Sequence, residues 1–184
     1  NSLSDLLVFG RRAGLSAADH ANHVGPGVVD SQQIDEGARE MLAPFERAAG
    51  DGPYDIHRGL QETMQNYVGI FRNEDDLKKG LSELQTLNER AARVKVEGSR
   101  LFNPGWHLAR DLKSMLTVSE AVALSALERK ESRGAHSRID FPNYDESLGK
   151  QNNITLRDGD HMKLKQLPIG EMPFELKQIL DEGK

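Results

Sequence analysis

The sequence has no cysteine, few aromatic residues and no long apolar run, and each absence excludes a class of function. Without cysteine the chain can form no disulfide, carry no thiol nucleophile and bind no zinc or iron–sulfur cluster through its own thiolates. No apolar run approaches the roughly 20 residues of a membrane-spanning helix, and no signal-peptide pattern opens the chain. With 24 basic and 29 acidic residues and no basic arm, nucleic acid is not an expected partner. These absences predict a soluble, intracellular protein.

What the chain contains is enough to build a core. Over 184 residues, 37% are apolar and 29% charged, a balance typical of a folded domain rather than a disordered one. The first residue is Asn1 and not methionine, and an apolar run begins almost at once, with Leu3 and then Leu6 to Phe9. We therefore expect the chain to be part of a longer polypeptide.

Hydrophobic periodicity predicts a mainly α fold. A helix rich in small residues is expected from Leu3 to about Ala21. Apolar residues then recur at steps of three and four, as on one face of a helix, over four further ranges: 32–49, 54–71, 74–96 and 104–129. Together the pattern predicts an antiparallel helical bundle with a spectrin-repeat-like three-helix core.

The helix predicted over 74–96 has the clearest signals. Asn73 is a good N-cap residue, and three acidic residues follow it at the positive end of the helix dipole. One apolar face continues along the range, through Leu77, Leu81, Leu84, Leu87, Ala91 and Val94. Such a one-sided face needs partner helices to cover it.

After Lys130 the pattern changes to a polar, glycine-containing loop over 131–145. Apolar residues on both sides of Asp158-Gly159 predict a hairpin of about 153–157 with 161–166. A short helix over 174–181 completes a small α+β tail.

A search for chemistry finds no catalytic residue and no metal site. The six histidines have no metal-ligand spacing, and His20 and His23 are interpreted as solvated residues near a helix end. There is no phosphate loop, dinucleotide fingerprint or nucleophile elbow. The acidic pair Asp75 and Asp76 is explained by the helix dipole rather than by acid–base catalysis.

Two segments are more specific. The first fourteen residues, NSLSDLLVFGRRAG, and residues 129–142, RKESRGAHSRIDFP, stand at the two ends of the helical region. Together with LQETMQ over 60–65 and VGIFR over 68–72, they resemble the C-terminal part of the flavoprotein subunit of succinate dehydrogenase and fumarate reductase. The resemblance covers about residues 1–145.

The resemblance implies a role near FAD for the start of the chain. In the family, the residues matched by Ser2 and Leu3 contact the isoalloxazine ring of FAD. A helix N-terminus carries partial positive charge and free N–H groups, which suit the negative edge of a reduced flavin. Residues 1–30 would then end the flavin-binding domain, 31–130 would be the helical bundle domain, and 131–184 the C-terminal loop, hairpin and helix.

The loop residues Glu131, Arg133, His136 and Arg138 are predicted to form an interface, because arginine forks suit carboxylates and backbone carbonyls of another surface. The alternative is local capping of the preceding helix, whose C-terminus favours the cations Arg129 and Lys130. The implied partners are the flavin-binding domain of the same polypeptide, an iron–sulfur subunit and, indirectly, a membrane anchor. The implied location is the cytoplasmic side of the bacterial cell membrane.

The family implies interconversion of succinate and fumarate, with the fragment inactive by itself. Departures from the family pattern occur at residues 102–107 and 146–150 and indicate a divergent branch. Two alternatives stay open at this point. One is the C-terminal region of an L-aspartate oxidase, and the other is a free-standing helical interaction module.

Overall fold

The computed structural model describes residues 2–182, and within them the fold is mainly α, as the sequence predicts. The helices are α1 (Ser2–His23), α2 (Ser31–Glu46), α3 (Pro53–Tyr67), α4 (Glu74–Ala91), α5 (Pro104–Glu128), the one-turn η1 (Leu148–Lys150) and α6 (Phe174–Glu182). The strands are β1 (Phe71–Arg72), β2 (Ser137–Arg138), β3 (Gln151–Asp158) and β4 (His161–Pro168). The chain divides into two units, 1–40 and 41–184, with the boundary inside α2.

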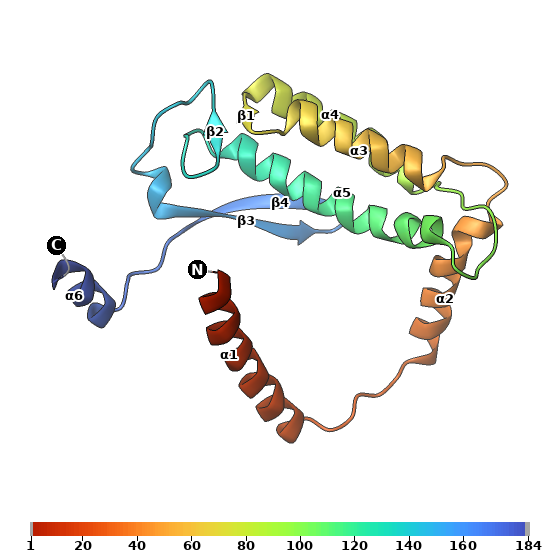
Figure 1. Cartoon of the computed structure of the whole chain (residues 1–184), viewed down its shortest axis with the longest axis horizontal. Helices are drawn as coiled ribbons and strands as arrows, with labels where there is room; N and C mark the ends of the chain where they lie inside the picture. The colour runs from red at the N-terminus through yellow and green to blue at the C-terminus, as the bar shows by residue number, and fades with distance from the viewer. Residues whose placement is uncertain (1, 183–184) are drawn as a thin grey trace. The chain divides into compact units, whose positions relative to one another are not determined.

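Helices α3, α4 and α5 form the core of the second unit, and each runs opposite to the helix before it (Figure 1). Their facing sides carry the residues that the periodicity marks as apolar, and the most deeply buried are Ile56, Leu77, Leu112 and Ala123. Gly80 lies where α4 crosses the end of α3. A Cβ there would stand 3.0 Å from side-chain atoms of Tyr67 and Val68, so glycine permits this close crossing.

Helix α2 is not a fourth member of the bundle, which corrects the expectation of four packed helices. The helix ends at Glu46, and Pro44 is its only buried residue. Phe45 packs at the edge of the core, against Trp106 of α5 with 5.4 Å between ring centroids. Only the last turns of α2 therefore contribute to the second unit.

The predicted ends of α3 and α4 were wrong by four and five residues. Helix α3 ends at Tyr67 because the chain turns at Gly69, where a Cβ would stand 2.7 Å from the carbonyl oxygen of Gln65. After α4 ends at Ala91, the backbone N–H of Val96 donates to the Pro44 carbonyl at 2.9 Å. Val96 is buried, so the apolar residues beyond α4 continue the core without continuing the helix.

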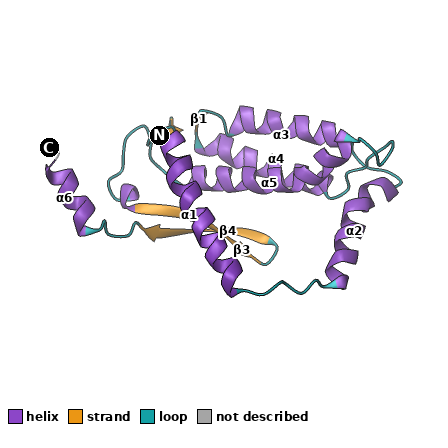
Figure 2. Cartoon of the chain, turned by 60° about the horizontal axis from the view of Figure 1, so that its bottom comes forward, coloured by secondary structure: helices purple, strands orange, loops and turns teal. Residues whose placement is uncertain are grey.

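The C-terminal tail contains the predicted hairpin, with strands longer than expected. Strands β3 and β4 pair antiparallel from Gln151↔Pro168 to Asp158↔His161. Gly159 has φ +62° at the first position of the two-residue turn, a conformation that favours glycine. The hairpin lies along α5 (Figure 2), where the Asn153 side chain donates to the Ser125 carbonyl at 3.1 Å.

Candidate functional site: the loop after helix α5

Glu131 is the centre of the first half of the loop over 131–145. Its side chain is fully buried, and its carboxylate accepts hydrogen bonds from Arg129 at 2.6 Å and from two nitrogens of Arg133 at 3.0 Å each. The backbone N–H of Asp145 donates to the same carboxylate at 2.8 Å. These bonds, that from Arg133 first, lower the pKa of Glu131 to about 2. The residue is therefore an ionised internal anchor of the loop.

Arg138 is the centre of the second half and is also fully buried. Its Nη1 donates to the carbonyls of Ala126 at 2.8 Å and Leu127 at 3.0 Å, near the C-terminus of α5. Its other side forms a two-bond ion pair with Asp140, at 2.8 Å for each bond. Arg138 thus satisfies carbonyls that the helix end leaves without helical partners.

Asp140 extends this connection to another helix. Its Oδ2 accepts from the backbone N–H of Glu74, the first residue of α4, at 2.9 Å. The hydrogen bond from Arg138 is the main cause that lowers the pKa of Asp140 to about 2. A carboxylate at a helix N-terminus and a guanidinium at a helix C-terminus both match the helix dipole. One ion pair therefore links the end of α5 to the start of α4.

His136 joins the loop to the end of α3. Its Nδ1 lies 2.9 Å from Nη1 of Arg72, and its Nε2 lies 3.0 Å from the carbonyl oxygen of Arg129. Arg72 in turn donates from Nε to the carbonyls of Val68 and Gly69. Burial lowers the pKa of His136. Beside it, β1 and β2 form a short parallel pair, Phe71↔Ser137 and Arg72↔Arg138.

A tight turn presents the outer side of the loop. The N–H and carbonyl groups of Arg133 and His136 bond to each other at 2.8 and 3.0 Å, and Gly134 between them has φ +58°. A turn with positive φ at its first central position favours glycine. The Arg133 guanidinium lies over the Tyr144 ring, 4.9 Å from its centroid. A shallow hollow of about 380 Å³ is lined by Ser132, Arg133, Gly134, His136, Ser137, Pro142, Asn143 and Tyr144.

The structure thus brings the four predicted loop residues together but gives them different surroundings. Glu131 and Arg138 are buried within the chain, His136 is half-buried, and the Arg133 side chain is 41% exposed. Ser2 and Leu3 lie in the first turn of α1 in the other unit, both exposed. The interface and flavin roles of these residues stay predictions.

Arg72, Arg129 and Asp140 complete the cluster, and of these the sequence analysis missed Arg72 and Asp140. Arg129 was expected as a cation suited to the C-terminus of the preceding helix, but its guanidinium bonds instead to Glu131 and to two backbone carbonyls later in the chain. Its Nη2 donates to the Gln151 carbonyl at 2.7 Å, which ties the loop to β3. Arg72 carries no signal in the sequence, since its partner His136 lies 64 positions away.

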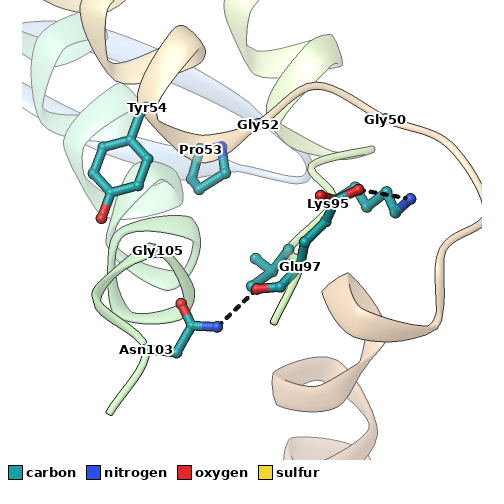
Figure 3. A pocket seen from close by; sticks show the side chains of 9 residues that line it. Gly50, Gly52, Pro53, Tyr54, Lys95, Glu97, Asn103 and Gly105 are labelled. Carbon is teal, nitrogen blue, oxygen red and sulfur yellow. Dashed lines mark hydrogen bonds and ion pairs between the residues drawn. The ribbon is translucent and has the colours of Figure 1, made fainter. Parts of the chain in front are cut away.

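A second hollow, of about 390 Å³, lies where the N-termini of α3 and α5 meet (Figure 3). Its wall is formed by Gly50, Gly52, Pro53, Tyr54, Lys95, Val96, Glu97, Asn103 and Gly105. The Asn103 side chain donates to the Glu97 carbonyl at 2.9 Å, and Lys95 pairs with the Glu97 carboxylate at 3.2 Å. Figure 3 marks both of these interactions with dashed lines.

In both hollows, several of the polar side chains bond to other groups of the chain. Among residues 2–182, no three His, Asp or Glu side chains lie together as a metal site would require. Over the same residues, no helix is long and apolar enough to cross a membrane. The loop is an assembly of ion pairs and helix caps, so what it can do chemically is hold and present a surface.

Comparisons with known proteins identify the domain. A family model described as the fumarate reductase flavoprotein C-terminal region matches residues 57–179. The fumarate reductase flavoprotein subunit of Mycobacterium tuberculosis is 36% identical over 178 residues, covering 92% of this chain and 30% of that subunit. The succinate dehydrogenase flavoprotein subunit of Coxiella burnetii is 34% identical over 181 residues, covering 96% and 31%.

A solved structure agrees. A chain of the Mycobacterium smegmatis Sdh1 complex in the apo form superimposes with a TM-score of 0.86 and 42% identity, covering 98% of this chain and 33% of that one. The family match defines the class of the domain: a helical C-terminal domain of the fumarate reductase flavoprotein type. The chain belongs to the succinate dehydrogenase and fumarate reductase flavoprotein family, and it spans about a third of the length of the relatives it matches.

Proposed function

We propose that the chain acts as the C-terminal domain of an FAD-dependent flavoprotein that interconverts succinate and fumarate and passes electrons to an iron–sulfur subunit. The observation that carries the proposal is the family match, which extends over most of the chain and includes the loop after α5. Within the domain, the bundle is the scaffold and the chemistry is supplied elsewhere in the polypeptide.

The first turn of α1 is proposed to lie against the flavin. The backbone N–H groups at a helix start have no helical partners and suit negative charge, and Leu3 is 78% exposed. Ser2 and Leu3 therefore fit the edge of an isoalloxazine ring, Ser2 by polar contact and Leu3 by apolar contact. The FAD would accept hydride and pass on electrons, whereas this helix end would hold and orient it.

The rest of α1 supports packing against the flavin-binding domain. No residue of α1 is buried, although the helix carries Leu6, Leu7, Phe9 and Leu15, all more than half exposed. Large apolar side chains gathered on one helix mark a surface that another part of a protein covers. We place the flavin-binding domain there.

The outer side of the loop is proposed to contact a neighbouring domain or subunit. Arg133 and Tyr144 form its exposed part, and Glu131 and Arg138 support them from inside. The partners are the flavin-binding domain and the iron–sulfur subunit. Anchoring at the cytoplasmic face of a bacterial membrane would then be indirect, through partner subunits.

A chimera tests the proposed function. In the Mycobacterium tuberculosis fumarate reductase flavoprotein subunit, the C-terminal region is replaced by this chain, and the complex is purified. We expect FAD absorbance and succinate–fumarate activity within about tenfold of the parent. A matched chimera with Leu3→Asp and Leu6→Asp is expected to lose FAD. A correctly folded first chimera without bound FAD would refute the proposal.

A second experiment tests the proposed function with the isolated 184-residue chain. It is expected to show no flavin absorbance and no succinate oxidation, because the proposal locates the chemistry elsewhere. Measurable turnover by the isolated chain would contradict that location.

The interface role has its own test in the same chimera. Arg133→Ala is expected to weaken association of subunits or domains on gel filtration while FAD stays bound. Arg58→Ala, on the exposed side of α3, is the control and is expected to change nothing. An Arg133→Ala complex as stable as the parent would exclude the interface.

A further inference from the structure

The two hydrogen bonds of His136 require one protonation state. A guanidinium has only N–H donors and a carbonyl oxygen only accepts, so Arg72 must donate to Nδ1 and Nε2 must donate to the Arg129 carbonyl. The ring is therefore neutral, with its proton on Nε2. A second proton on Nδ1 would place two donors face to face.

The partners of His136 belong to the ends of two helices. Arg72 also holds the carbonyls of Val68 and Gly69 after α3, at 3.1 and 2.8 Å. The carbonyl of Arg129 directly follows α5 and also accepts from Arg138 at 3.3 Å. The neutral ring thus connects the C-terminal ends of α3 and α5, beside the two-residue pair of β1 with β2.

The charges that face His136 are all positive. Arg72 faces it from β1, Arg129 from the end of α5 and Arg138 from β2, and each of them opposes a positive ring. The two nearby carboxylates, Glu131 and Asp140, are already paired with Arg129 and Arg133, and with Arg138. A proton added to the ring would therefore find no free counter-charge among the described neighbours.

We propose that His136 is an acid-sensitive clasp: when its Nδ1 is protonated, the bond to Arg72 breaks, β1 separates from β2, and the loop over 131–145 detaches from the end of α3. The outer surface with Arg133 and Tyr144 loses its fixed position at the same time. The clasp is a property of this chain and does not depend on the proposed function.

The geometry determines whether the clasp opens or closes as the pH falls. The folded state favours the neutral ring, because burial lowers the pKa of His136 below its ordinary 6.5. The clasp is intact above that value and opens as the pH falls through the lowered pKa. Between 6.5 and the lowered pKa, the equilibrium constant for opening rises by up to about tenfold for each pH unit, and below the lowered pKa it levels off because both states then hold the proton.

Amide hydrogen exchange of the full chain tests the clasp. The reporter is the backbone N–H of Ile139, which donates to the Arg72 carbonyl at 2.8 Å. Protection is measured between pH 7.5 and 4.5, with correction for intrinsic exchange, while NMR follows the titration of His136. We expect Ile139 to lose protection at least tenfold as His136 titrates, while Leu84 in the core stays protected. Unchanged protection of Ile139 after His136 is protonated would overturn the proposal.

Variants separate the clasp from general acid sensitivity. His136→Gln keeps one donor and one acceptor but cannot titrate, so its Ile139 protection is expected to be independent of pH. His161→Gln, on the exposed hairpin, is the matched control and is expected to respond like the original chain. An undiminished pH response in His136→Gln would assign the effect to another group and refute the clasp. The NMR titration of the original chain decides the question even if His136→Gln folds poorly.

Discussion

Two arginines and a backbone amide converge on one buried carboxylate, Glu131. Removing one partner of a buried ion pair is strongly destabilising, because the other charges remain without compensation. We expect Glu131→Gln to lower the free energy of unfolding by about 3 kcal/mol. Urea denaturation at pH 7 measures it, with the exposed Glu146→Gln as control. A loss no larger than in the control would mean that solvent screens this cluster.

The same carboxylates determine how the chain responds to strong acid. Glu131 and Asp140 have pKa values lowered to about 2, so the folded state holds fewer protons than the unfolded state. Their contribution to stability is complete above about pH 4.5 and is lost as the pH falls toward 2. Denaturation midpoints between pH 5 and 2.5 are expected to fall steeply, and Glu131→Gln is expected to flatten that slope. Parallel slopes would assign acid unfolding to other groups.

These residues also mark the limit of prediction from sequence. Glu131 and Arg138 are charged, and charged residues are rarely fully buried unless they are paired. Their partners Arg129, Arg133 and Asp140 are near in sequence, but nothing in a sequence pattern says that a loop folds over them. The loop was predicted as an interface, with local helix capping as the alternative; Arg138 and Asp140 do cap helix ends, and the interface stays a prediction.

At the scale of elements, the N-cap of α4 is a feature that sequence predicted and structure confirms. Oδ1 of Asn73 accepts from the backbone N–H of Asp76 at 2.9 Å. Asn73→Ala is therefore expected to cost about 1 kcal/mol of stability, whereas Asn73→Ser is expected to keep most of it. Thermal unfolding followed by circular dichroism compares the two. Equal losses for alanine and serine would show that the cap bond is not the cause.

The opposite faces of α5 provide a second test. Leu112 is fully buried in the hydrophobic core, and Val118 on the same helix is 62% exposed. Leu112→Ala is expected to lower the free energy of unfolding by about 3 kcal/mol, and Val118→Ala by less than about 0.5 kcal/mol. Denaturant titration measures both. Similar losses at the two positions would mean that α5 packs with a different face.

Elements with a local signal were predictable, and those without one were not. The apolar period located α4 and α5, and Asp158-Gly159 located the hairpin. The β1 and β2 pair has two residues in each strand, too few for any alternating pattern. The end of α3 was predicted too late because Phe71 continues the apolar spacing, although the chain has already left the helix at Gly69.

For the molecule as a whole, the division into units predicts how removal of residues 1–30 affects stability. No residue of α1 is buried, and the residues between α1 and α2 are exposed. A chain of residues 31–184 is therefore expected to keep the stability of the full chain within about 0.5 kcal/mol. Differential scanning calorimetry of both chains measures it. A loss above about 1 kcal/mol would show that residues 1–30 contribute to the stability of the chain.

The hydrogen bonds that join the helix ends to the loop also affect the order of folding. Helices α3, α4 and α5 follow one another directly, whereas Arg72 and His136 meet across 64 positions. Closing such a long span costs entropy before its contacts form, so the loop docks after the folding transition state. Asp140→Asn, which weakens the contact with Glu74 across 66 positions, is then expected to accelerate unfolding roughly tenfold while the refolding rate changes less than about twofold. Stopped-flow refolding and unfolding in urea would reveal this asymmetry.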